Sequence, residues 1–282
     1  KIGSKLHQGD TLPELPEVET IARGLQKPLC GQRIVAWDIL NPGSAKGFAG
    51  QALFQLSHEH ITGVSRRGKL LFLELGQNLL LAFHLRMTGR LLLEASANPE
   101  KHTRLIFSLS SGQNLVFQDK RKFGYCKLLA GHELGSWPFY ADLGPEPLQI
   151  DRNAFLALFQ GKKARIKSLL LDQRFIAGIG NIYADESLHL AGIHPASSAS
   201  ELQQSHFMAL HQALQEVLLR AIDCGGSSFN DYVNSLGNPG SYQDGFMVYG
   251  RRGQPCKKCG SMLQGAKVAG RGTVFCPCCQ VL

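Results

Sequence analysis

Apolar and polar positions alternate in short runs through the first half of the chain and follow a helical period through much of the second half. The strand-like runs are bounded by Gly, Asn and Ser, and they cover residues 33–40, 70–75, 79–85, 105–109 and 115–117. Several short strands separated by turn residues predict a β-sandwich. Apolar residues at helical spacing predict one helix ahead of them, beginning near Pro16 and ending before Gly31.

The strand pattern stops near residues 143–151, where two prolines and a glycine occur together. Helical periodicity then predicts helices at residues 153–159, 164–171, 181–191 and 201–222. A stretch rich in turn-forming residues follows at 225–245, and a loop of this length is either a functional lid or a mobile connection. We therefore expect a β domain followed by a helical domain.

The region after residue 244 holds six Lys and Arg residues, no Asp or Glu, and five of the eight cysteines. Four of them form the pattern Cys256-x2-Cys259-x16-Cys276-x2-Cys279, and two close thiolate pairs joined by a hairpin's length of chain can bind Zn²⁺ tetrahedrally. Cys278 is the alternative fourth ligand, although the symmetric pairing favours Cys279. Four ligands leave no open position, so one structural zinc ion is predicted.

Between the two cysteine pairs, residues 267–275 resemble two strands around a glycine-flanked arginine, Arg271. The tip of such a hairpin can insert a guanidinium into a DNA groove or an active site. A solvated arginine in a turn has the same pattern, and the spacing alone leaves both interpretations open.

Charge adds a class of partner. The chain has 30 Lys and Arg against 22 Asp and Glu, a formal +8, which suits a polyanion such as nucleic acid or anionic lipid and is equally typical of a well-solvated surface. Basic clusters occur at residues 66–69, 120–122 and 162–167. In the last cluster Lys163 and Lys167 are spaced i, i+4, so one helix face would hold both for successive phosphates.

Two further features have alternative interpretations. Phe123 lies beside two cations, where it either wedges next to a base or packs in the core. Two glycines precede Asn181, the predicted N-cap of a helix, and the free amides of that helix start, with the Asn side chain, suit a phosphate. The glycine pattern is weak when taken alone.

Hydropathy predicts no membrane segment, because the longest apolar stretches run to about five residues, whereas a span needs roughly 18. The opening segment also lacks the apolar core of a signal peptide. The cysteines are therefore interpreted as thiols or metal ligands in a reducing compartment. We expect a cytoplasmic, monomeric protein.

Eight motifs occur in collinear order from Pro13 to the C-terminus. They are PELPEVET (13–20), RRGK (66–69), HLRMTG (84–89), EKH (100–102), RKFG (121–124), LGPEP (143–147), GIGNIYADE (178–186) and AGRGTxFCPxCQ (269–280). Together they closely resemble the bacterial formamidopyrimidine-DNA glycosylase family. The PELPE opening resembles the branch that excises oxidised purines, since the related endonuclease VIII group generally opens with PEGPE.

The resemblance implies an α+β protein. Its parts would be an N-terminal β-sandwich with flanking helices at 13–147, a helix-two-turn-helix domain at 148–245 with a lesion-capping loop at 225–245, and a four-cysteine β-hairpin zinc finger at 246–282. The partner it implies is double-stranded DNA containing an oxidised purine or an abasic site, bound between the domains with the damaged nucleotide flipped out.

The resemblance also implies base-excision repair by a bifunctional glycosylase and AP lyase. Pro13 matches the proline whose amine attacks C1′ of the damaged nucleotide, and Glu14 matches the acid that protonates the sugar ring oxygen. Lys69 matches the lysine of β-elimination. Arg271 matches the hairpin arginine linked to δ-elimination and to phosphate binding.

The same resemblance assigns DNA contacts. The positions that match backbone-contacting or phosphate-clamping residues are His102, Arg121, Lys162, Lys167 and Asn181. Met87, Arg121 and Phe123 match the trio that fills the gap left by the extruded base. A thioether and an aromatic ring can replace lost stacking, and a guanidinium can hydrogen-bond an orphaned cytosine.

One feature departs from the family pattern. Twelve residues, KIGSKLHQGDTL, precede Pro13, so its nitrogen is an amide and is not nucleophilic. We expect residues 1–12 to be a tag or other non-native extension, or to be removed. The alternatives are a non-catalytic lesion-binding protein with a blocked Pro13, and a glycosylase for oxidised pyrimidines.

Overall fold

The structure is a computed structural model that describes residues 13–76, 78–96, 98–228 and 232–281. These residues form two compact units. One unit comprises residues 13–143 together with 221–243, and the other comprises 144–220 together with 244–281. The extension predicted at residues 1–12 lies outside the described residues.

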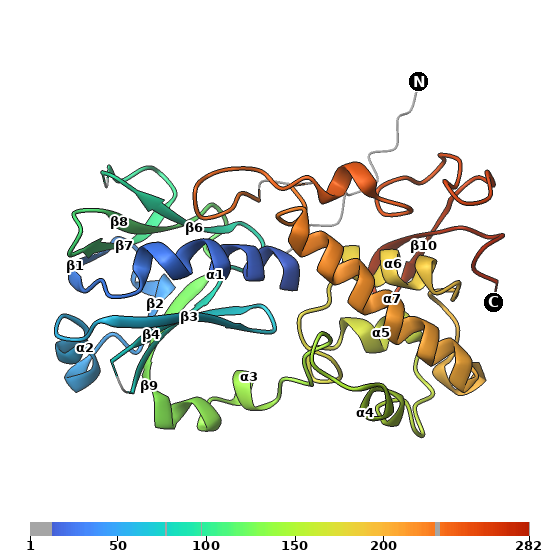
Figure 1. Cartoon of the computed structure of the whole chain (residues 1–282), viewed down its shortest axis with the longest axis horizontal. Coiled ribbons are helices and arrows are strands. Elements are labelled where there is room, and N and C mark those ends of the chain that lie inside the picture. Colours follow the sequence, from blue (N-terminus) through green and yellow to red (C-terminus); the bar gives the residue numbers. More distant parts are fainter. Residues whose placement is uncertain (1–12, 77, 97, 229–231, 282) are drawn as a thin grey trace. The chain divides into compact units, whose positions relative to one another are not determined.

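The first unit contains two sheets (Figure 1). The four-stranded sheet has the order β1-β7-β8-β6, and the five-stranded sheet has the order β2-β9-β5-β4-β3, with β2 and β9 parallel and the other pairs antiparallel. The strands are β1 Ile34–Ile39, β2 Ala45–Lys46, β3 Ile61–Arg67, β4 Leu70–Leu75, β5 Leu79–His84, β6 Gly89–Glu94, β7 Thr103–Leu109, β8 Asn114–Asp119 and β9 Tyr125–Ala130. The helical segments are α1 Leu15–Leu29, η1 Pro42–Ser44, α2 Gly50–Leu56, η2 Gly131–Ser136 and α3 Pro138–Ala141.

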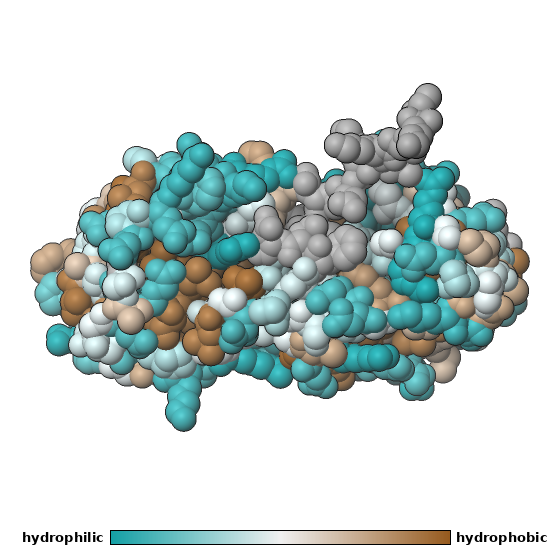
Figure 2. Space-filling view, turned by 90° about the horizontal axis from the view of Figure 1, so that it is seen from above, coloured by the Kyte–Doolittle hydropathy of each residue, from teal (hydrophilic) through white to brown (hydrophobic). Residues whose placement is uncertain are grey.

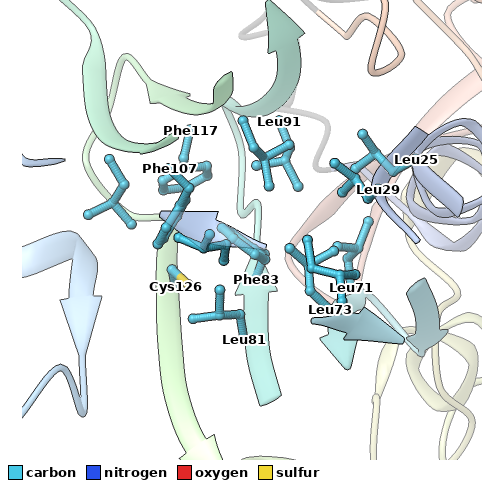
Figure 3. Close-up of a cluster of buried hydrophobic side chains, with 14 of the residues drawn as sticks. Leu25, Leu29, Leu71, Leu73, Leu81, Phe83, Leu91, Phe107, Phe117 and Cys126 are labelled. Carbon is cyan, nitrogen blue, oxygen red and sulfur yellow. The ribbon is translucent and has the colours of Figure 1, made fainter. Parts of the chain in front are cut away.

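Alternate strand residues meet between the sheets and form one apolar core (Figure 3). Leu81 and Phe83 of β5 are fully buried there, and α1 adds Leu25 and Leu29 to the same cluster. Burying a side chain of this size contributes roughly 1.5–3 kcal/mol. The core therefore fixes the strands from whose ends the polar turns project.

The predicted strands and the helix predicted from Pro16 are all present. The sequence does not predict β3, β6 or β9, because charged residues such as Arg66, Arg90 and Lys127 interrupt their apolar runs. Their pairing with β4, β8 and β5 supplies the stability that their own pattern does not indicate.

The second unit contains short helices and a β-hairpin (Figure 1). Its elements are α4 Arg152–Ala157, α5 Ile166–Leu171, α6 Asn181–Leu190, η3 Ala199–Glu201, α7 Gln204–Asp223 (whose last turn belongs to the first unit), η4 Tyr242–Gly245 (whose first two residues belong to the first unit), β10 Gln264–Val268 and β11 Arg271–Phe275. The four predicted helices correspond to α4 to α7. Ala269 and Gly270 form the hairpin turn with left-handed φ angles of 52° and 72°, so Arg271 opens β11 and does not lie at the tip.

The loop after α7 packs against the sandwich. Leu93 of β6 donates its backbone N–H to the carbonyl of Ser235 at 2.9 Å. Gly225 and Gly226 have positive φ and turn the chain away from α7. The loop thus belongs to the same compact unit as α1, although it follows the helices in the sequence.

The face seen in Figure 2 is mainly hydrophilic where its residues are described, with apolar side chains gathered on the part of the view that the sandwich occupies. Among the described residues, no helix combines the length and the apolarity that crossing a membrane requires.

Candidate functional site

The start of α1 holds Pro13 and Glu14, and both are buried. Glu17, one turn further along, accepts the backbone N–H of Glu14 on its carboxylate at 2.9 Å and so caps the helix. The other carboxylate oxygen of Glu17 accepts the backbone N–H of Ser227 at 2.7 Å. One buried side chain therefore fixes the backbone beside Pro13 and the start of the loop after α7.

Tyr232 adds a second link between this loop and α1. Its hydroxyl donates to the backbone carbonyl of Glu17 at 3.3 Å. Burial raises the pKa of Tyr232, and the nearby Glu17 charge raises it further, so the hydroxyl stays protonated as a donor. A Cβ at Gly226 would lie 3.0 Å from the Glu17 carboxylate, which also requires glycine at this left-handed position.

Lys69 lies in the two-residue turn between β3 and β4. Arg67 and Leu70 are register partners, so Gly68, with φ 58°, and Lys69 form the turn. Arg66 forms a salt bridge with Glu19 of α1 at 2.9 Å, and the Arg66 side chain is only 7% exposed. This pairing ties the turn that holds Lys69 to the helix that begins after Pro13.

Met87, Arg121 and Phe123 lie on two turns that one carboxylate joins. Asp119 is buried and accepts the backbone N–H groups of Arg121 at 3.1 Å and Gly124 at 2.7 Å. It also accepts the hydroxyl of Thr88, the neighbour of Met87, at 2.5 Å. The structure thus brings the predicted trio together.

Arg121 and Phe123 are exposed, and Met87 is half-buried. Phe123 is 55% exposed, which excludes the core-packing interpretation. The Arg121 guanidinium lies 5.1 Å from the centre of the Phe123 ring, a distance at which a cation is attracted to the ring face.

His102 and Lys162 have different surroundings. His102 is half-buried, and its carbonyl accepts the backbone N–H of Asp119 at 2.9 Å, so it adjoins the turn that presents Arg121. Lys162 is exposed in the connection between α4 and α5, in the other compact unit.

The four predicted zinc ligands converge in the second unit. The sulfur atoms of Cys256, Cys259, Cys276 and Cys279 all lie within 4.8 Å of one another. Tetrahedral thiolates at a Zn–S distance of about 2.3 Å are separated by roughly 3.8 Å, and the Cys259–Cys276 and Cys256–Cys279 separations are 3.4 and 4.0 Å. Cys278 is exposed and outside this group. The donor set fits one structural zinc ion.

Lys167 differs from its expected role. Its side chain has 0% exposure, and its Nζ lies 2.5 Å from Asp185 Oδ1 and 2.7 Å from the hydroxyl of Thr273. A phosphate cannot reach an amine buried in this way, so the direct contact that the resemblance implies is corrected to a structural role beneath β11. Lys163 precedes α5 and shares no helix face with Lys167.

Burial changes the acidity of the carboxylate in this pair. It raises the pKa of Asp185 to about 6, although the Lys167 ammonium opposes the rise. Asp185 also accepts the backbone N–H of Val274 at 3.1 Å. The pair therefore connects α5 and α6 to the strand β11, which carries Arg271. The Arg271 side chain is exposed.

Three further polar residues of α6 contact the chain around the zinc ligands. Asn181, its first residue, donates from Nδ2 to the carbonyl of Gly272 at 3.0 Å, and Gly180 supplies the N-cap position predicted for Asn181. Glu186 accepts three consecutive backbone N–H groups, from residues 247 to 249, at 2.8–2.9 Å. His189 Nε2 lies 3.5 Å from Cys256 Sγ.

Sequence reasoning missed the carboxylates that position these groups. The spacing of Glu14 and Glu17 is that of a capping box, and Asp119 precedes a turn, where Asp commonly accepts backbone N–H groups; both signals were available. Asp185 gives no such signal, because its partner Lys167 is 18 positions away and only the fold brings the two together.

Sequence models of three domains match the chain. They are the formamidopyrimidine-DNA glycosylase N-terminal domain at residues 12–126, the formamidopyrimidine-DNA glycosylase H2TH domain at 143–233, and a zinc finger found in FPG and IleRS at 253–281.

Two curated relatives illustrate the similarity. A formamidopyrimidine-DNA glycosylase from Desulforamulus reducens is 43% identical over 277 residues, which cover 95% of this chain and 99% of the relative. One from Lactococcus lactis is 42% identical over 272 residues, which cover 95% and 99%. The similarity therefore extends over nearly the whole chain.

Solved structures are similar to this chain over the same extent. The Lactococcus lactis protein in complex with DNA containing an abasic site has a TM-score of 0.87 and 39% identity, with 95% of this chain and 100% of that chain covered. A variant of the same protein, bound to DNA containing Fapy-dG, has the same TM-score and identity, with 96% and 100% covered.

Proposed function

This chain belongs to the formamidopyrimidine-DNA glycosylase family, and on that premise we propose that it acts in base-excision DNA repair as a bifunctional DNA glycosylase and AP lyase. The proposed substrates are 8-oxoguanine and formamidopyrimidines in double-stranded DNA, and abasic sites. We further propose that the protein is a monomer in the bacterial cytoplasm, associated with the nucleoid through DNA.

The fixed start of α1 is the observation that supports the proposal most strongly. Pro13 lies directly ahead of a helix that Glu17 caps, and Glu14 is buried beside it at 1% exposure. A nucleophile must be held within reach of C1′ while the base departs, and a capped helix start supplies that fixed position. A carboxyl group one residue away can exchange protons with the reacting sugar.

The proposed reaction begins with the Pro13 nitrogen, once it is a secondary amine. The amine forms a bond to C1′ while the glycosidic bond breaks and the base leaves with the bonding electrons. The Pro13 nitrogen then loses its proton, which regenerates its lone pair, and the departed base takes up a proton. Glu14 gives a proton to the ring oxygen, the sugar opens, and Pro13 holds C1′ as an iminium ion. Lys69 then serves β-elimination, in which a C2′ proton is removed and the 3′ phosphate departs, and Arg271 serves the δ-elimination that follows.

The DNA-binding residues have separate proposed tasks. Met87 and Phe123 fill the space that the extruded nucleotide leaves, and Arg121 hydrogen-bonds the orphaned partner base. His102, Lys162 and Asn181 contact the backbone. Lys167 supports the strand that carries Arg271, and zinc at the four cysteines keeps that hairpin folded.

Borohydride trapping tests the proposal. The chain that begins at Pro13 is mixed with an oligonucleotide duplex containing 8-oxoguanine, and reduction of the iminium ion is expected to give a covalent adduct. The matched control keeps the twelve preceding residues, whose amide bond to Pro13 removes the nucleophilic lone pair. No adduct is expected for the control.

Each other outcome identifies an alternative. Salt-sensitive DNA binding without an adduct from the chain that begins at Pro13 would favour the non-catalytic lesion-binding protein. Faster excision from oxidised pyrimidines than from oxidised purines would favour the second candidate specificity. A solved structure of the Lactococcus lactis relative, at 39% identity and a TM-score of 0.86, contains oxidised-pyrimidine DNA, which makes that comparison necessary.

A further inference from the structure

Three cations that are distant in the sequence gather on the outer face of the five-stranded sheet. Lys46 Nζ lies 3.8 Å from the centre of the Tyr125 ring, Lys127 Nζ lies 5.4 Å from that of Trp137, and Arg86 Cζ lies 5.7 Å from that of Phe139. We call these six residues the cation–aromatic patch.

The rings of the patch form a connected layer. The Tyr125 and Trp137 centroids are 6.5 Å apart, and those of Trp137 and Phe139 are 5.7 Å apart. The His84 ring contacts both ends of this layer, with its centroid 5.3 Å from that of Phe139 and 5.9 Å from that of Tyr125. Each cation therefore lies near an aromatic ring that packs against the other rings.

The arrangement of the two lysines is unfavourable for the folded protein alone. Lys46 and Lys127 are direct register partners between β2 and β9, and like charges that face each other across a strand pair repel. Burial lowers the pKa of Lys46, and the charges of Arg86 and Lys127 lower it further. Among the described residues, no carboxylate forms a salt bridge with Lys46, Arg86 or Lys127.

The patch adjoins residues of the proposed reaction. Arg86 directly precedes Met87 in the chain. Leu70, the residue after Lys69, is the register partner of His84, and His84 in turn pairs with Tyr125 of the patch. A polyanion that reaches Lys69 and Met87 therefore meets positive charge if it continues along this face.

From this juxtaposition we infer that the cation–aromatic patch binds backbone phosphates of the DNA that flanks the lesion. The cations supply charge that no carboxylate of the described residues pairs with, and bound phosphates would relieve their mutual repulsion. The contact is independent of base sequence, because it involves only the backbone. The inference rests on the proposed function for its partner, and it extends the DNA contacts beyond the positions that the motifs indicate.

The test is the double variant Lys46→Gln and Lys127→Gln in the full chain. The logarithm of the dissociation constant for duplex DNA is measured against the logarithm of salt concentration, with lesion-containing and undamaged duplexes. Each lost phosphate contact changes this slope by about 0.9, so the double variant is expected to lower its magnitude by about 2 for both duplexes. Lys27→Gln is the matched control, since Lys27 is exposed near the opposite end of α1 from Pro13.

A thermal melt followed by circular dichroism separates binding from stability. Because the double variant removes facing like charges, its Tm is expected to equal or exceed that of the wild type while its salt slope falls. An unchanged slope, or a slope that Lys27→Gln lowers equally, overturns the inference. A lower Tm with an unchanged slope assigns the lysines to stability alone and also overturns it.

The trapping experiment keeps this result distinct from the proposed function. If the wild-type chain that begins at Pro13 forms the adduct and the double variant retains the wild-type slope, only the patch is refuted. If that wild-type chain forms no adduct, the proposed chemistry fails, whatever the slope of the double variant.

Discussion

The two compact units hold their functional side chains by different means. In the sandwich, an extended apolar cluster that includes Leu81 and Phe83 fixes the strands, and the turns project Lys69 and Phe123 from strand ends. The apolar cluster around the zinc ligands has only four buried residues, two of which are ligands themselves, Cys256 and Cys276. There, buried polar contacts from α6 and the metal replace the missing apolar core. The sandwich should therefore tolerate loss of zinc, whereas the hairpin should not.

The variant Cys256→Ser is expected to show the largest difference between the two units. Loss of one thiolate from a four-ligand site is expected to abolish stable zinc binding and to unfold the hairpin that carries Arg271, because structural zinc supplies folding free energy in small modules. Zinc content by metal analysis and DNA affinity are both expected to fall. The two tryptophans, Trp37 and Trp137, lie in the sandwich unit, so their fluorescence unfolding curve should be unchanged.

The reciprocal control is Phe83→Ala. Truncation of this fully buried ring is expected to lower the free energy of unfolding of the sandwich by about 3–5 kcal/mol, with zinc content preserved. If either variant shifted both readouts equally, the two units would be one cooperative structure and the comparison would be wrong.

The same contrast explains what the sequence could predict. Periodicity predicted α1 and the apolar strands, and cysteine spacing predicted the zinc ligands, because both signals are local. The burial of Lys167 could not be predicted, since a lysine in a basic cluster is usually solvated and its partner Asp185 reaches it only through the packing of α6. Strand β9 was not predicted, so the sequence pattern did not indicate that Lys127 lies on the sheet. The cation–aromatic patch was therefore not predicted either.

Lys167→Met tests the buried polar contacts of the second unit. The variant leaves the Asp185 carboxylate at 1% exposure without its cation, and breaking a buried pair in this way costs about 3–5 kcal/mol. We expect faster zinc release to a chelating dye and faster hydrogen exchange at Val274. The double variant Lys167→Met with Asp185→Leu removes both charges and should recover much of the loss; equal defects in both variants would contradict the assignment.

The stability of the sandwich depends on pH through His84. Burial lowers the pKa of His84 to about 3, with the charges of Arg86, Lys69 and Lys46 adding to the effect. The unfolded chain takes up a proton near pH 6.5 and the folded sandwich does not. The stability contribution of His84 is therefore full above pH 6.5 and falls as pH decreases toward 3, by up to about 1.4 kcal/mol per unit.

Urea unfolding followed by tryptophan fluorescence at pH 7 and pH 5 measures this dependence. His84→Phe keeps an aromatic ring among Tyr125 and Phe139 but cannot take up a proton, so its two midpoints should differ less than those of the wild type. An identical pH dependence in the variant would assign the effect to other groups.

The smallest expected effect concerns His189, which joins the polar contacts of α6 to the metal site. Its ring is buried, and an Nε2–H donated to the Cys256 thiolate would stabilise the charge on that ligand. Partners of this kind typically change metal affinity by 10–100-fold, and we expect about tenfold for His189→Leu, measured as zinc lost to a competing chelator. In the cobalt-substituted protein, the thiolate charge-transfer bands should shift. His194→Phe is the matched control, because His194 packs against Phe275 with ring centroids 4.4 Å apart and its Nδ1 accepts the backbone N–H of Ala196. Wild-type zinc affinity and unshifted bands in His189→Leu would show that α6 holds the hairpin without acting on the metal.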